Sequence, residues 1–154
     1  MKFATFSIPG PDGPLAGVIR DERVYALTDG VTVVDVLAGQ AKPETTDRSW
    51  ALDEVTLLAP VPAPGTVYAI GLNYARHVQE TGGQRPEAPI VFVKVRGSVA
   101  PPSGPIRCPE VVRRLDYEGE LVIVMGAAGE IAGYCIADDV SARDLQGRAA
   151  VDAR

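Results

Sequence analysis

Two glutamates in the second half of the chain lie two positions apart in a mostly apolar run. Residues two apart in a strand share a face, so Glu118 and Glu120 would lie together with Val122 and Val124. The opposite face is also apolar, which predicts a strand covered on both sides. Two such carboxylates repel one another unless a cation compensates, and hard divalent ions bind carboxylate oxygens. The pair indicates either a metal site or a solvated strand face.

The chain has a single histidine, His77, and Glu80 follows it by three residues. On a helix this spacing places both side chains on one side, within reach of each other. A carboxylate that holds one imidazole nitrogen leaves the other nitrogen to act as a base toward water. The alternative is a weak ion pair on the surface. The spacing alone favours the surface pair, while the preceding Gly71-Leu72-Asn73, where an apolar stretch ends in glycine, adds support for the catalytic interpretation because sites often lie at such junctions.

Acidic residues also gather between Asp138 and Asp144. Their types alone favour a helix N-terminus, with Asp138 and Asp139 as cap and first-turn acids. Lys94 lies inside an apolar run, and its position alone indicates a lysine at a sheet edge that extends its amine to solvent. Spacing by itself gives neither Asp139 nor Lys94 a chemical role.

Short strands and one helix, on the far side of a proline-rich boundary, would position these residues. Alternate prolines in residues 59–65 hold the backbone extended. Before the boundary we expect strands over 2–8, 14–19 and 24–27, a hairpin turn at 21–22, a helix over 32–38 and a polar loop over 40–50. After it we expect strands over 66–70, 90–95, 115–125 and 133–137, a helix over 74–80, and a helix beginning near 138–141.

The composition is that of a folded globular chain. Of 154 residues, 46% are hydrophobic and 23% are charged, which excludes a disordered tail, a fibrous repeat and a coiled coil. The net charge is −5 and no run is rich in lysine and arginine, so we expect no nucleic-acid partner. The apolar runs are too short to cross a membrane, and the two cysteines are too few for a disulfide scaffold. We therefore expect a cytoplasmic protein.

Several of these segments, in this order, resemble the fumarylacetoacetate hydrolase family. The matching words are Ile70-Gly71-Leu72-Asn73-Tyr74, Val91-Phe92-Val93-Lys94, Asp116-Tyr117-Glu118-Gly119-Glu120-Leu121, Gly133-Tyr134 and Asp139-Val140-Ser141-Ala142-Arg143-Asp144-Leu145-Gln146. The resemblance is strong over residues 66–146 and loose over 1–62. It implies an α+β, mainly β fold: a small β-rich N-terminal domain over 1–62, then part of a mixed β-sandwich roll over 63–154 that usually forms a homodimer.

The resemblance also implies roles for individual residues. Glu118, Glu120 and Asp139 look like the three carboxylate ligands of a Mg²⁺ or Mn²⁺ ion, with Ca²⁺ as a further candidate. His77 and Glu80 resemble the family's catalytic pair that positions and deprotonates water. The residues that would bind the oxygens of the substrate are Arg143, Gln146 and Lys94.

The chain departs from the family pattern in three places. Residues 126–132 replace a longer insertion between two strands, and Asp138 stands where a neutral residue is commoner. The family continues beyond Gln146 with further strands, which predicts that this chain is a C-terminally truncated member. One possible DNA coding of a family-like continuation yields these six residues, 149–154, when it is translated from its third base. We therefore interpret residues 149–154 as a frameshifted stretch.

The expected function is that of a divalent-metal-dependent enzyme in the breakdown of aromatic compounds. Its substrates would be 2-oxo or 2-hydroxydienoate carboxylic acids. The reaction would be acylpyruvate-type C–C hydrolysis, or isomerisation or decarboxylation of the 2-hydroxyhepta-2,4-diene-1,7-dioate type. The alternative is a truncated, non-catalytic remnant that acts as a binding or dimerisation module. A carboxylate-rich Ca²⁺-binding module is a weaker interpretation because no EF-hand loop is present.

Overall fold

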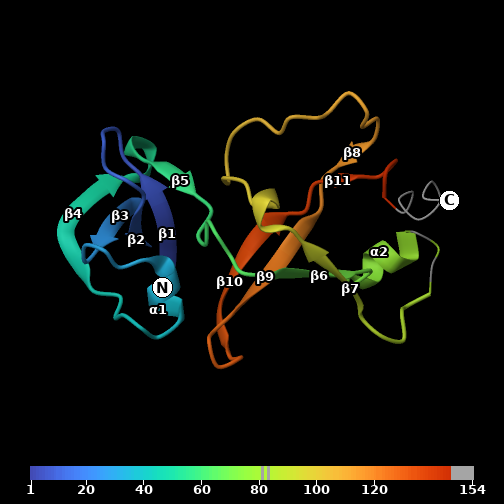
Figure 1. The fold of residues 1–154 in the computed structure, drawn as a ribbon, viewed down its shortest axis with the longest axis horizontal. Helices are drawn as coiled ribbons and strands as arrows, with labels where there is room; N and C mark the ends of the chain where they lie inside the picture. The colour runs from blue at the N-terminus through green and yellow to red at the C-terminus, as the bar shows by residue number, and fades with distance from the viewer. Residues whose placement is uncertain (81, 83, 147–154) are drawn as a thin grey trace.

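The first part of the chain is one antiparallel sheet with a short helix. The computed structural model describes residues 1–80, 82 and 84–146, so the interpretation of residues 149–154 lies outside the described residues. Five strands pair in the order β4-β3-β2-β1-β5 (Figure 1). The elements are β1 (Lys2–Ser7), β2 (Leu15–Arg20), β3 (Arg23–Leu27), α1 (Val33–Leu37), β4 (Thr45–Ala51), the 3-10 turn η1 (Leu52–Glu54) and β5 (Thr56–Leu58).

The predicted hairpin between β2 and β3 is confirmed, and its turn residues explain it. Asp21 and Glu22 both have positive φ angles, 45° and 63°. Two left-handed residues in a two-residue turn match the twist of the flanking strands, so Arg20 pairs directly with Arg23. The turn therefore sets the register of the β2–β3 pair.

The buried core of the first part consists of two apolar clusters on the sheet. One joins Ala16, Val18, Leu27 and Val33 of α1, and the other joins Ala4, Phe6 and Val24. Gly17 lies against the second cluster, where an added Cβ would be 2.6 Å from the Val24 side chain and 2.7 Å from Tyr25 O. The position therefore accepts only glycine without a shift of the neighbouring strand.

The prediction of a polar loop over 40–50 is wrong, because Thr45–Ala51 forms the edge strand β4. An antiparallel edge strand keeps one face in solvent, so polar residues are compatible with it. Its apolar anchor is Trp50, which pairs with Val24 and lies 5.6 Å from Phe6 between ring centroids. The guanidinium of Arg48 lies over the Trp50 ring, 5.3 Å from its centroid.

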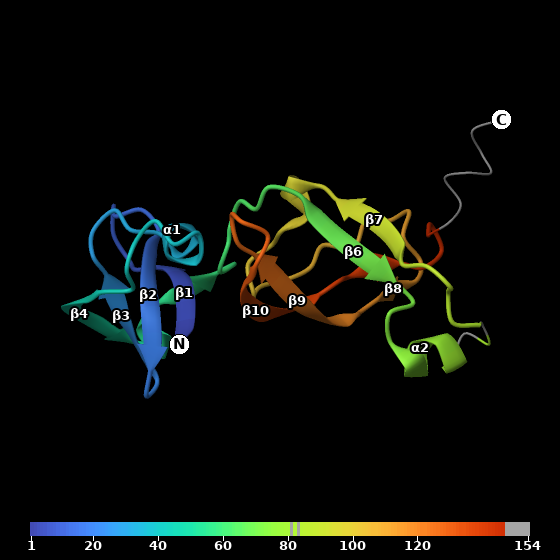
Figure 2. The same ribbon diagram turned by 90° about the horizontal axis from the view of Figure 1, so that it is seen from below.

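The second part consists of three antiparallel strand pairs (Figure 2). They pair β6 with β7, β9 with β10, and β8 with β11. The bounds are β6 (Val67–Gly71), α2 (Ala75–Glu80), β7 (Ile90–Lys94), the 3-10 turn η2 (Arg96–Ser98), β8 (Leu115–Asp116), β9 (Gly119–Met125), β10 (Ile131–Asp138) and β11 (Ser141–Ala142). The mainly β class predicted from the sequence is confirmed.

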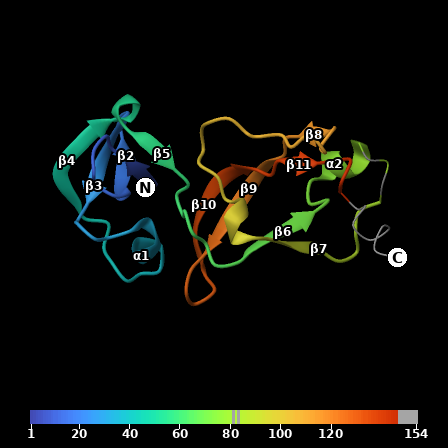
Figure 3. The same cartoon turned by 45° about the horizontal axis from the view of Figure 1, so that its top comes forward.

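Two predicted elements of this part are wrong in the same region. The expected single strand over 115–125 is interrupted at residues 117–118 and gives β8 and β9. The expected helix near 138–141 is absent: β10 runs to Asp138, and Ser141 pairs with Asp116 (Figure 3). The reason is that Asp139 N donates to Glu118 O at 2.8 Å, a bond between distant segments that replaces a local cap.

The strands of the second part leave apolar faces exposed. Leu121 and Ile123 of β9 are 61% and 49% exposed, so the prediction of a strand covered on both sides is wrong for the described residues. Val78 of α2 is the one buried apolar residue among those described after residue 33. Within the described ranges, no helix has the length and apolar character needed to span a membrane.

Candidate metal and substrate site

Two of the three predicted metal ligands face one another where β9 meets β10. Gly119 pairs with Asp138, and the Asp139 N to Glu118 O bond extends this pairing by one residue. The side chains of Glu118 and Asp139 are 21% and 17% exposed. The side chain of Asp138 turns back and accepts a hydrogen bond from Glu118 N at 2.8 Å. The break between β8 and β9 is thus held by backbone and side-chain bonds from the end of β10.

Arg143 connects the two sides of this break. Its Nε donates to Asp116 Oδ2 at 2.8 Å and its Nη2 donates to Glu118 Oε1 at 2.5 Å. Its Nη1 donates to Gln146 Oε1 at 3.1 Å, so both predicted substrate-binding residues of this segment lie together. Ser141 Oγ donates to the second oxygen of Glu118 at 3.2 Å.

These bonds shift the pKa values of Asp116 and Arg143 in opposite directions. The hydrogen bond from Arg143 lowers the pKa of Asp116, and the bonds to Asp116 and Glu118 raise the pKa of Arg143. Both groups therefore stay charged throughout the physiological pH range.

Lys94 reaches another carboxylate of this cluster, Asp139, from the end of β7. Its Nζ forms an ion pair with Asp139 Oδ1, and its side chain is 29% exposed. The interpretation of Lys94 as an edge lysine with its amine in solvent is therefore wrong. Its amine instead lies beside a predicted metal ligand and 5.3 Å from the centre of the Phe92 ring.

Glu120, the third predicted ligand, pairs with Ala137 in the β9–β10 ladder and is half-buried. It makes no ion pair with another described residue. The described residues bring no three carboxylate, histidine or cysteine side chains close enough for a metal centre. The donor set nevertheless fits a hard divalent ion, because Glu118 and Asp139 supply carboxylate oxygens and each already holds a cationic nitrogen.

His77 and Glu80 lie on α2, at the end of the second part that is remote from the first sheet (Figures 1 and 2). His77 is half-buried and bonded within the structure, while Glu80 is exposed and its side chain forms no bond with another described residue. The turn into α2 passes through Leu72 with φ of 53°, a conformation that costs a bulky residue about 1–2 kcal/mol. The catalytic role of this pair stays a prediction.

Tyr74, directly before α2, ties this helix to the strand that carries Glu120. Leu121 N donates to Tyr74 Oη at 3.1 Å, across 47 positions of sequence. Sequence reasoning assigned no role to Tyr74, or to Asp116 and Ser141 at the carboxylate cluster. All three lie within the family-like words, but their types do not reveal which distant group they bond.

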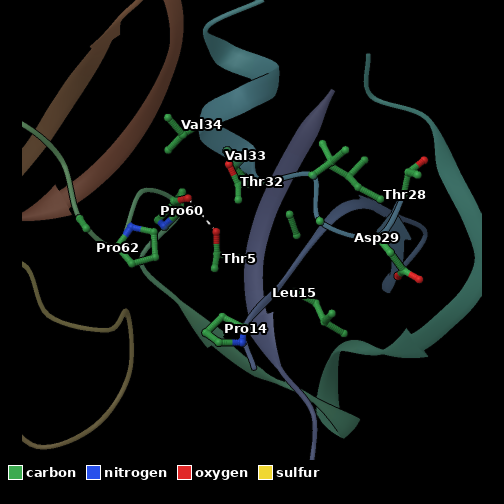
Figure 4. Close-up of a pocket in the computed structure, with 15 residues that line it drawn as sticks. Thr5, Pro14, Leu15, Thr28, Asp29, Thr32, Val33, Val34, Pro60 and Pro62 are labelled. Atoms are coloured by element: carbon green, nitrogen blue, oxygen red, sulfur yellow. Dashed lines mark hydrogen bonds between the residues drawn. The ribbon is translucent and has the colours of Figure 1, made fainter. Parts of the chain in front are cut away.

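A hollow beside the cluster adds space for a small ligand. It encloses about 210 Å³ and is lined by Asp116, Tyr117 and Asp138, with three apolar residues around them. The first part of the chain has a larger cavity, about 310 Å³, between β1, β2, residues 28–34 and the prolines after β5 (Figure 4). Thr5 Oγ1 closes one side by donating to Pro60 O at 2.8 Å.

The fold and this cluster together match one family of proteins. The model of the fumarylacetoacetate (FAA) hydrolase C-terminal domain matches residues 66–153, and that of an Rv2993c-like N-terminal domain matches residues 1–60. The chain belongs to the fumarylacetoacetate hydrolase family.

Individual relatives carry more specific names. Protein Rv2993c of Mycobacterium tuberculosis is 43% identical over 114 residues, which make up 68% of this chain and 43% of that protein. Oxaloacetate tautomerase fahd2, mitochondrial, of Xenopus laevis is 40% identical over 102 residues, which make up 60% of this chain and 32% of that protein. The crystal structure of 5-carboxymethyl-2-hydroxymuconate delta-isomerase from Mycobacterium smegmatis has a TM-score of 0.74 and 34% identity, and the match covers 95% of this chain and 57% of that one.

The matched region is only part of each relative. The chain spans between about one third and three fifths of the length of these three proteins. Two of the three names give an activity, one a tautomerase and the other an isomerase.

Proposed function

We propose that this chain carries the metal-binding part of an enzyme that acts on 2-oxo carboxylic acids or their enol forms. The observation that carries the proposal is the meeting of Glu118, Asp139, Lys94 and Arg143 at the ends of β7, β9, β10 and β11. Acidic metal ligands beside cationic substrate groups suit an anionic, chelating ligand. A small 2-oxo acid has both of these properties.

Glu118, Asp139 and Glu120 would hold the metal ion, with Mg²⁺ or Mn²⁺ as the expected ion and Ca²⁺ as a further candidate. Such an ion, when bound, stabilises negative charge on a substrate oxygen. The cluster lacks a third converging carboxylate in its present geometry. Glu120 would therefore have to turn toward Glu118, which lies two residues before it and just outside β9.

The remaining predicted site residues would bind the substrate and accept a proton. Arg143, oriented by Asp116, and Lys94 would bind the carboxylate of the substrate, and Gln146 would donate to a further oxygen. His77 would accept a proton at one imidazole nitrogen, and Glu80 would have to turn toward His77 to hold the other nitrogen.

The names of the relatives favour proton transfer as the shared step. A tautomerase and an isomerase both move a proton between carbon and oxygen of a keto–enol unit, which needs a base and a stabilised enolate. Acylpyruvate-type C–C hydrolysis and decarboxylation, the other reactions expected from the sequence, produce an enolate as well. We therefore propose 2-oxo acid isomerisation, including oxaloacetate enol–keto conversion, as the first activity to assay.

A second candidate is a non-catalytic binding or dimerisation module. It is favoured by the exposed apolar side chains on β6, β7, β9 and β10, which contrast with the buried clusters of the first sheet. A cytoplasmic location, a role in aromatic breakdown and a homodimeric state remain expectations that accompany the first candidate.

The decisive assay follows oxaloacetate enol and an acylpyruvate spectroscopically with the purified chain, with and without Mn²⁺. We expect metal-dependent conversion that is lost in Glu118→Gln and kept in Glu110→Gln, a matched change at an exposed glutamate outside the site. A folded chain that binds Mn²⁺ but converts neither compound would favour the binding module instead.

A further inference from the structure

Negative charge is concentrated at the junction of β8, β9 and β10. Five carboxylates lie within this short segment of structure: Asp116, Glu118, Glu120, Asp138 and Asp139. Like charges this close repel each other, and partial burial strengthens the repulsion. The cluster therefore needs cations to keep its shape when no metal ion is bound.

Two cations fill this need, and each bonds to a predicted metal ligand. Lys94 pairs with Asp139, and Arg143 pairs with Glu118. They come from separate elements, the end of β7 and the segment after β11. Both contacts are partly shielded from water, because the four side chains are only 17–29% exposed.

The two cations differ in how firmly they are anchored. Arg143 has a second carboxylate partner in Asp116 and a third contact in Gln146, so loss of Glu118 would leave it in place. Among the described residues Lys94 has one ion pair, with Asp139, and its amine is on a flexible four-carbon stem. The Lys94–Asp139 contact is therefore the one that can exchange without dismantling the cluster.

We infer that Lys94 is a positioning residue that holds Asp139 in the metal-free chain and releases it when a divalent ion binds. This inference rests on the proposed function, since it needs Asp139 to be a metal ligand. The carboxylate of Asp139 thus has a positively charged partner both before and after the exchange. It also frees the Lys94 ammonium for the substrate carboxylate only after the metal ion is in place, which orders the two binding events.

Metal affinity provides the first test. Because Lys94 competes for Asp139 and repels a cation, Lys94→Met is expected to bind Mn²⁺ about tenfold more tightly by calorimetry. Lys42→Met, a change at an exposed lysine in the first part of the chain, is expected to leave the affinity unchanged. If the wild type binds Mn²⁺ and Lys94→Met binds it equally or more weakly, the inference is overturned while the proposed metal site stands.

The second test needs no metal ion. Thermal unfolding in chelator is compared for the wild type, Lys94→Met, Asp139→Asn and the double variant. We expect Lys94→Met to lower the midpoint in the wild-type background and to have little effect in the Asp139→Asn background. Additive shifts would overturn the inference. If the effects of the two substitutions are coupled but the wild type binds no Mn²⁺, the proposed metal site is contradicted. The exchange is then contradicted as well.

Discussion

Arg143 illustrates how one side chain is fixed by three contacts from different segments. Asp116 binds its Nε, Glu118 binds its Nη2 and Gln146 binds its Nη1. A guanidinium has a rigid fork of donors, so this arrangement sets the orientation of its plane as well as its charge. Asp116 therefore acts on the site through Arg143.

The role of Asp116 leads to a prediction about binding. Asp116→Asn removes a charged partner of Arg143, so the guanidinium loses orientation and 2-oxo acid affinity is expected to fall about tenfold. Calorimetry with a non-reacting 2-oxo acid would measure this. Asp53→Asn, at an exposed residue of η1, is the matched control and should have no effect. Equal affinity of Asp116→Asn and the wild type would show that Arg143 is oriented without Asp116.

The same ion pair predicts a pH dependence. Arg143 lowers the pKa of Asp116 from its ordinary value of 3.8, so the carboxylate binds its proton less readily in the folded chain than in the unfolded one. Its contribution to stability is thus fully present above that ordinary value and is lost as the pH falls through the lowered pKa. Carboxyl NMR titration should show the pKa of Asp116 rising toward its ordinary value in Arg143→Met. The same pKa in both proteins would contradict the pairing.

At the scale of elements, α2 is a short helix that depends on distant partners. It has six residues, too few to be stable alone, and Val78 is its one buried side chain. The bond from Leu121 N to Tyr74 Oη connects its start to β9. The position of His77 relative to the carboxylates thus depends on this attachment.

Tyr74→Phe should loosen the attachment of α2. The substitution leaves Leu121 N without its acceptor and is expected to cost about 0.5–1.5 kcal/mol. Hydrogen exchange should become faster in α2 while the amides of β1–β3 keep their protection. Tyr68→Phe changes a tyrosine that is 67% exposed and serves as the control. Unchanged exchange in α2 would mean that other contacts hold the helix.

Elements that are determined by neighbouring residues could be predicted from the sequence. Elements that depend on a contact with a distant segment could not. The β2–β3 hairpin was predictable because Asp21 and Glu22 make the turn by themselves. The strand β4 was not, because its polar residues are stabilised through one anchor, Trp50, against Phe6. The helix expected near Asp139 failed because the amide of that residue bonds to Glu118, 21 positions earlier.

The candidate site shows the same division. Family-like words predicted that Glu118 and Asp139 belong together, and the ladder between β9 and β10 does bring them together. No local pattern indicated that Lys94 would reach Asp139, 45 positions away, or that Asp116 would hold Arg143, 27 positions away. Such partners depend on which strand ends meet, and that is decided by packing of the whole chain.

The whole molecule combines a well-packed first part with a second part whose sheets keep open faces. Leu121 pairs with Ile136 and Ile123 pairs with Tyr134, so these four residues share one face of the β9–β10 sheet. All four are exposed, from 49% to 86%. A contiguous apolar face of this kind is typical of a surface that is covered by another polypeptide segment.

This face, defined by Leu121, Ile123, Tyr134 and Ile136, predicts self-association. We expect the purified chain to form a homodimer in light scattering, and Ile136→Lys to shift it toward monomer because a charge cannot be buried there without cost. Val111→Lys, at a residue that is 63% exposed outside this face, should leave the distribution unchanged. A monomeric wild type, or equal effects of both variants, would contradict the prediction.

The central claim is that the carboxylates at the junction of β9 and β10 bind a divalent metal ion. It is tested most directly by Mn²⁺ titration of the wild type and Glu118→Gln, followed by calorimetry. We predict one ion bound per chain in the wild type and loss of that binding in Glu118→Gln, with the fold of both proteins verified by circular dichroism. A folded wild type that binds no Mn²⁺, or a Glu118→Gln variant that binds it equally well, would contradict the account.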